Sequence, residues 1–80
     1  MQEIKNENGY ATSDLYLSAF LKAKGLKLID QYSDRGKMYF VFKESEKRKK
    51  LLQDFYNNGM VSANNFKNAL QDLKTILFNH

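Results

Sequence analysis

The residues of this chain that could do chemistry are mainly cations. A run of four, Lys47-Arg48-Lys49-Lys50, follows shortly after Lys43. Adjacent side chains on a helix point in different directions, so at least two of the four should face solvent together. Such a cluster can neutralise the phosphates of a nucleic acid. The competing interpretation is the solvated start of a helix, because short basic runs often serve only that role.

A second candidate for nucleic-acid chemistry is Tyr39. We expect its ring on the outer face of a hairpin, among Lys27, Arg35 and Lys37, where it could stack on an unpaired base. Self-association and partial burial are the alternatives for this ring. The complete set of predicted nucleic-acid-binding residues is Lys43, Lys47, Arg48, Lys49, Lys50 and Tyr39.

Residues for catalysis are nearly absent. His80 is the only histidine, there is no cysteine, and no Gly-rich phosphate loop, HExxH or nucleophile-elbow pattern occurs. Glu44 with Glu46, or Asp30 with Asp34, supplies too few oxygen donors for a strong divalent-cation site, and such residues are typical of solvated turns. We therefore expect no enzyme activity, no catalytic residues, no metal site, no cofactor and no small-molecule substrate.

Length and composition favour one small domain. The chain has 80 residues, near the lower limit for folding without staples, but its five tyrosines and six phenylalanines can make the core dense. The absence of cysteine is compatible with a reducing cytoplasm. No apolar run is long enough for a membrane span, and the polar start lacks a secretory signal. A net charge of +4 fits a polyanionic partner, although solubility alone would explain it.

The element around which the fold should be organised is a helix over residues 13–25. Thr12 or Ser13 can cap its start, Asp14 places a carboxylate at its positive end, and Gly25 can end it. Its apolar residues are Leu15, Tyr16, Leu17, Ala19, Phe20, Leu21 and Ala23. They sweep an arc of roughly 240°, whereas a helix with one packing partner needs a stripe somewhat wider than about 100°. We therefore expect this helix to be covered from two sides.

A β-hairpin is predicted next, with strands over residues 26–32 and 37–43 and a turn over 33–36. Alternation directs one set of side chains toward the first helix: Leu26, Leu28, Tyr32, Met38, Phe40 and Phe42. The opposite face carries Lys27, Ile29, Gln31, Tyr39, Val41 and Lys43. Because two strands alone are marginally stable, something should either cover this face or extend the sheet by pairing with its edge. The predicted interface of a homodimer is Ile29, Tyr39 and Val41.

Two further helices complete the predicted domain. One should begin at Glu46 after a Ser45 cap and end at Asn57, and the other should run over residues 63–78 after a Ser62 cap. The predicted fold is a single α+β domain of order α-β-β-α-α over residues 12–79. Residues 1–11 lack periodicity and are expected to be a disordered N-terminal segment.

Several short motifs resemble a family of small bacterial and phage proteins that is known only as a domain of unknown function. They are Thr12-Ser13-Asp14-Leu15-Tyr16-Leu17, Lys24-Gly25-Leu26-Lys27-Leu28, Tyr39-Phe40-Val41-Phe42, Asp54-Phe55-Tyr56-Asn57, Val61-Ser62-Ala63 and Ala69-Leu70 with Leu73-Lys74. The resemblance covers about residues 11–79 and rests mainly on caps and core positions. It implies a phage or mobile-element setting, with a nucleic acid or a host protein as partner, and it carries over no catalytic residue. The basic run is not part of the shared pattern.

Two functional hypotheses follow from the sequence. The first is a cytoplasmic accessory protein that binds nucleic acid through the basic helix start. The second is a protein-interaction module, either a hairpin-mediated homodimer or a protein that docks on, or inhibits, a host or phage protein. Salt separates them, because phosphate binding weakens steeply as salt rises whereas an apolar interface hardly responds.

Overall fold

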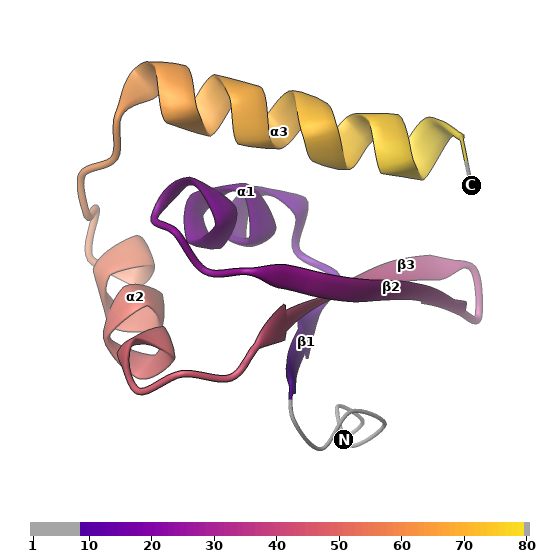
Figure 1. The fold of residues 1–80 in the computed structure, drawn as a ribbon, viewed down its shortest axis with the longest axis horizontal. Coiled ribbons are helices and arrows are strands. Elements are labelled where there is room, and N and C mark those ends of the chain that lie inside the picture. The colour runs from indigo at the N-terminus through magenta and orange to yellow at the C-terminus, as the bar shows by residue number, and fades with distance from the viewer. Residues whose placement is uncertain (1–8, 80) are drawn as a thin grey trace.

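A computed structural model describes residues 9–79 as a three-stranded antiparallel sheet with helices against one face (Figure 1). The elements in chain order are β1 (Gly9–Thr12), α1 (Leu15–Ala23), β2 (Leu28–Asp34), β3 (Lys37–Lys43), α2 (Lys47–Tyr56) and α3 (Ala63–Phe78). The predicted α+β class is confirmed. The order is β-α-β-β-α-α, with one more strand than the sequence predicted.

Helix α1 begins with a cap supplied by Asp14. The Asp14 Oδ1 accepts hydrogen bonds from the backbone N–H groups of Tyr16 and Leu17, both at 3.0 Å. The prediction that Thr12 or Ser13 caps this helix is therefore wrong. Thr12 instead holds the cap residue in place, because its Oγ1 accepts the Asp14 N–H at 3.1 Å.

Gly25 ends α1 as predicted. Its φ of +100° is a left-handed conformation that favours glycine, and it allows the chain to fold back over the last turn. The Gly25 N–H donates to the Lys22 carbonyl and the Leu26 N–H to the Leu21 carbonyl, each at 3.0 Å. This pair of bonds is the Schellman arrangement, which also brings Leu26 into the core beside Leu21.

Helix α1 is the centre of the core, and it lies between the sheet and α3 with α2 at its side (Figure 1). Phe20 is 3% exposed, and its ring centroid lies 5.4 Å from that of Phe55 on α2. The expectation of cover from two sides is confirmed. Two details differ: Tyr16 is 56% exposed, whereas Ser18 is fully buried, its hydroxyl donating to the Asp14 carbonyl at 2.8 Å.

Strand β1 is the element that the sequence did not reveal. Residues 9–12 pair antiparallel with β3, so the prediction of a disordered segment is wrong for residues 9–11; residues 1–8 lie outside the described part. Gly9 is pressed against β3, since a Cβ at this position would meet the Val41 Cγ1 at 2.6 Å. A strand of four residues is too short to show a hydrophobic period, and its pairing with β3 stabilises it.

The hairpin has a tighter turn than predicted and a shifted register. Arg35 and Gly36, with φ of 55° and 82°, form a two-residue turn of the kind that matches strand twist. An irregularity between Leu28 and Asp30 then shifts the alternation of β2 by one residue.

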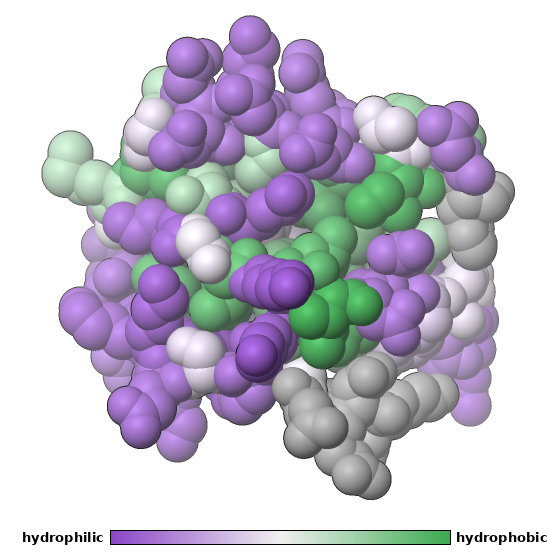
Figure 2. Space-filling model, in the orientation of Figure 1, coloured by the Kyte–Doolittle hydropathy of each residue, from purple (hydrophilic) through white to green (hydrophobic). Residues whose placement is uncertain are grey.

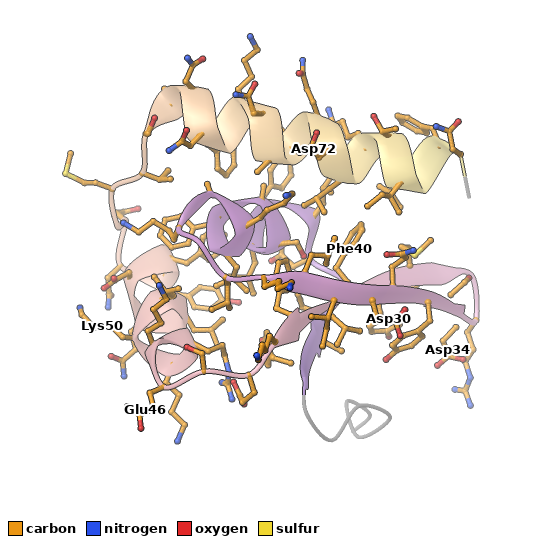
Figure 3. All side chains as sticks on the ribbon, viewed as in Figure 1. Asp30, Asp34, Phe40, Glu46, Lys50 and Asp72 are labelled. Atoms are coloured by element: carbon orange, nitrogen blue, oxygen red, sulfur yellow. The ribbon has the colours of Figure 1, made fainter. Side chains whose placement is uncertain are left out.

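This shift moves Tyr32 to the outer face of the sheet, opposite Tyr39, and Gln31 to the helix-facing side, opposite Phe40. The sequence predicted the opposite faces for Tyr32 and Gln31, because that prediction assumed unbroken alternation along the strand. Figure 3 shows Phe40 on the helix side of the sheet and Asp30 and Asp34 on the other side.

Helices α2 and α3 follow the predicted pattern closely. Helix α3 is capped by the Ser62 Oγ, which accepts the Asn65 N–H at 3.3 Å, and it buries Ala69 and Leu73 against α1. Its outward residues are hydrophilic, as the purple band along the top of the molecule shows (Figure 2). Helix α2 begins at Lys47, one residue later than predicted, with Glu46 rather than Ser45 at the cap position, although the Ser45 Oγ accepts the Lys47 N–H at 3.1 Å. Within residues 9–79, no helix combines the length and the apolar character that crossing a membrane requires.

Candidate nucleic-acid interface

The four cations of the basic run do not form one surface. Leu51 is buried and marks the inward face of α2, and Arg48, one turn before it, lies on the same face. At about 100° per residue, Lys47 and Lys50 then fall on one flank of the helix and Lys49 on the other. The run is therefore divided among three directions.

Arg48 has a structural role. Its Nη2 lies 2.6 Å from the Glu44 Oε2, its Nε donates to the Glu44 Oε1 at 2.9 Å, and its guanidinium lies 4.6 Å from the centroid of the Tyr10 ring. The hydrogen bond from Arg48 lowers the pKa of Glu44, and the same bond raises the pKa of Arg48. The side chain of Arg48 is 18% exposed. This residue thus fastens α2 to the preceding loop and to β1.

Lys50 and Lys49 are exposed, and each has an acidic side chain nearby. The Lys50 Nζ lies 3.3 Å from the Asp54 Oδ1, one turn along the same helix, so its charge is partly compensated. Lys49 faces away on the opposite flank. Neither residue adds a positive charge to the part of the surface beside the sheet.

Three lysines from three different segments do come together. The Lys43 N–H donates to the Lys27 carbonyl at 2.8 Å, and because Leu28 pairs with Phe42, Lys27 stands directly opposite Lys43 on the outer face of the sheet. Opposed Cβ atoms in such a pair are about 4.5–5.5 Å apart. All three lysines are exposed.

Lys47 lies near the segment that carries Lys27, since its ammonium group is close to Gly25. A Cβ at Gly25 would lie 3.8 Å from the Lys47 Nζ, and Gly25 precedes Lys27 by only two residues, a span of at most about 7 Å. The end of α1 carries the negative end of the helix dipole, which favours a cation there. We call Lys27, Lys43 and Lys47 the lysine surface.

No carboxylate compensates the lysine surface within ion-pair distance in the part of the chain that the structure describes. Lys27 and Lys43 stand opposite one another, so their ammonium groups repel each other, and an anion between them removes that repulsion. Sequence reasoning found Lys43 and Lys47 but not Lys27 as a member of the site. The signal was available, because the predicted hairpin already placed Lys27 on the same face as Lys43.

Tyr39 lies apart from the lysine surface. It is four residues from Lys43 along β3, about 14 Å, so it does not neighbour Lys27 as predicted. Its ring is half-buried and stacks on Tyr32, with centroids 5.2 Å apart and an interplanar angle of 12°. Part of the ring surface proposed for a base is therefore taken by Tyr32.

The predicted dimer interface is not one exposed patch. Val41 has no exposed surface, so it cannot contribute to contacts with another chain, while Ile29 is 44% exposed. Val41 was assigned to an open face because the sequence gave no sign of β1, whose Gly9 packs against it.

The remaining polar clusters give no sign of catalysis. An open cavity of about 510 Å³ at the start of α2 is lined by Glu44, Ser45, Glu46, Arg48 and Lys49, and therefore mixes both charges. Among residues 9–79, no group of three or more histidine or acidic side chains could hold a metal ion. The absence of an enzymatic or metal site stays a prediction.

Comparison with known proteins identifies the family but not an activity. Residues 7–79 match the family described as "Domain of unknown function (DUF5659)", and this match covers most of the chain, so the chain belongs to that family. No curated protein and no solved structure matches it.

Proposed function

We propose that this member of the DUF5659 family is a cytoplasmic, non-enzymatic accessory protein, of the kind carried by phages or mobile elements, that binds the phosphate backbone of a nucleic acid. The observation that supports the proposal is that three segments bring Lys27, Lys43 and Lys47 to one region, where no carboxylate of residues 9–79 lies within ion-pair distance of them. Arg48 is not part of this binding site, because Glu44 and Tyr10 already engage it.

The physical basis of binding is release of counterions. Lysine ammonium groups act as point charges on phosphate oxygens and read no bases, so the expected binding is sequence-independent. If each lysine of the surface neutralises one phosphate, the logarithm of the association constant should fall with the logarithm of salt concentration with a slope of about −2.1 on single strands and about −2.7 on duplex.

The test is fluorescence anisotropy with labelled single-stranded and duplex DNA and RNA between about 50 and 200 mM salt. The variant Lys27→Gln/Lys43→Gln/Lys47→Gln should bind weakly and with an almost flat salt dependence. The matched control Lys49→Gln/Lys67→Gln/Lys74→Gln loses the same charge at exposed positions elsewhere and should retain most of the slope. Equal losses in the two variants, or binding of the wild type weaker than about 100 μM at physiological salt, would overturn the proposal.

A protein-interaction role is the second candidate function. The homodimer through Ile29, Tyr39 and Val41 loses support, because Val41 is buried within the chain. A different feature favours this role, namely the free edge of β2.

A further inference from the structure

Strand β2 is an edge of the sheet, since the strand order is β1-β3-β2. The two-residue turn makes Asp34 and Lys37 a hydrogen-bonded pair, and alternation makes Tyr32 and Tyr39 the next one. The backbone groups of Ser33, which lies between these two pairs, and of Gln31, which follows beyond Tyr32, therefore point to the free edge. The Gln31 N–H donates to the neighbouring Asp30 Oδ1 at 2.8 Å, so a side chain occupies the place of an adjacent strand.

A cavity lies beside this edge on the helix side of the sheet. Helix α3 has 16 residues and α1 has nine, so the C-terminal part of α3 extends past α1 over the hairpin (Figure 1). The open space between them, about 510 Å³, is lined by Gln31, Thr75, Ile76 and Asn79. A residue opposite Gln31 on an added strand would direct its side chain into this space.

The outer side of the same strand carries two carboxylates, one of which, Asp34, has Lys37 opposite it on β3. Asp30 and Asp34 flank Tyr32 at two residues on either side, and both lie on the sheet face away from the helices (Figure 3). Positions opposite them on an added strand would be four residues apart on one face, and basic side chains there would meet the two carboxylates.

These charges favour a different protein over a second copy of this chain. An antiparallel pairing of two β2 strands centred on Tyr32 would place Asp30 of each copy opposite Asp34 of the other. Like charges directly opposite one another destabilise a sheet. Within the regular part of β2, residues 30–34 beyond the irregularity, the edge thus disfavours the self-pairing with the greatest overlap, and it accepts a basic strand.

We propose that the β2 edge docks an extended basic segment of a partner protein, which adds to the sheet as a fourth strand. Backbone groups of the segment replace Asp30 at the Gln31 N–H, and one apolar side chain enters the cavity under α3. Two cations of the segment, four residues apart, pair with Asp30 and Asp34. The lysine surface plays no part in this docking, so it holds or fails independently of nucleic-acid binding.

The probe is a blocked peptide of sequence Thr-Lys-Val-Thr-Val-Lys-Thr, titrated into ¹⁵N-labelled protein and followed by amide chemical shifts. We expect the amides of Gln31 and Ser33 to shift and to saturate, while the same peptide with glutamate for both lysines leaves them unchanged. The variant Asp30→Lys/Asp34→Lys should reverse this preference and bind the glutamate peptide.

Two further variants complete the test. Glu46→Lys/Asp72→Lys makes the same charge change at exposed positions away from β2 and should bind the lysine peptide as wild type does. Thr75→Trp, at an exposed position that lines the cavity, should weaken peptide binding several-fold and leave nucleic-acid binding unchanged. The proposal is overturned if the lysine peptide shows no saturating shifts up to about 1 mM, if it binds the Asp30→Lys/Asp34→Lys variant equally well, or if the Gln31 and Ser33 shifts instead follow protein concentration, which would mean self-pairing.

Discussion

Helix α1 and the lysine surface are neighbours that are built in opposite ways. Helix α1 has a cap at each end and buried residues around most of its circumference, and its C-terminal Gly25 lies against the Lys47 ammonium group. The lysine surface consists of three exposed side chains of like charge. The contrast teaches that stability is concentrated in α1, and that the exposed lysines are free to serve binding at little cost to the fold.

Phe20→Ala gives the largest effect expected from this comparison. Phe20 on α1 is almost inaccessible and packs against Phe55 of α2, so the free energy of unfolding should fall by about 3–5 kcal/mol. Tyr16→Ala on the same helix removes a ring that is 56% exposed, and it should change stability by about 0.5 kcal/mol or less. Chemical denaturation of both variants measures the difference, and equal losses would mean that α1 is not buried from two sides.

Asp14→Ala tests the start of the same helix and should cause an intermediate loss of stability. The Asp14 carboxylate accepts two backbone N–H groups, and loss of a cap of this kind costs about 0.5–2 kcal/mol. Ser13→Ala, at the position that the sequence favoured as a cap, should be nearly neutral. A larger loss for Ser13→Ala than for Asp14→Ala in thermal unfolding would contradict the observed cap.

Glu44→Gln tests the ion pair between Arg48 and Glu44, which joins α2 to the preceding loop. The folded-state pKa of Glu44 lies below its ordinary value of 4.5, mainly because Arg48 donates to the carboxylate. Its contribution is therefore fully present above that ordinary value and is lost as the pH falls through the lowered one. The substitution should cost about 0.5–1 kcal/mol near neutral pH, a modest amount because both side chains remain partly exposed.

The control for this pH dependence is Glu46→Gln, an exposed glutamate in the same loop. Its stability difference from wild type should stay small and flat between neutral and acidic pH. If Glu44→Gln shows the same flat profile as Glu46→Gln, then the bond to Arg48 does not hold α2 in solution.

The sequence was most informative where local rules decide the structure. The bounds of α3, the Gly25 ending of α1 and the presence of the hairpin follow from periodicity, caps and turn residues. The sequence was least informative where contacts between distant segments decide the structure. Strand β1 depends on pairing with β3, and the shift at Ile29 depends on how β2 fits its neighbour, so the exchange of Gln31 and Tyr32 could not be read from alternation.

The candidate site shows the same division. A run of four adjacent cations is the conspicuous signal in the sequence, but folding divides it and turns Arg48 inward. The cations that gather come from residues 27, 43 and 47, which only the hairpin pairing and the Schellman ending of α1 bring together. Adjacency in sequence on a helix separates side chains, whereas pairing of strands joins them.

The most direct test of this account compares two single substitutions that remove the same charge. Lys27→Gln lies outside the basic run but in the lysine surface, whereas Lys49→Gln lies inside the run but outside that surface. In anisotropy titrations over a range of salt concentrations, Lys27→Gln should flatten the salt slope by about 0.7–0.9, the value for one lost phosphate contact, and Lys49→Gln should leave it unchanged. The opposite result, a flattened slope for Lys49→Gln and a wild-type slope for Lys27→Gln, would contradict the account.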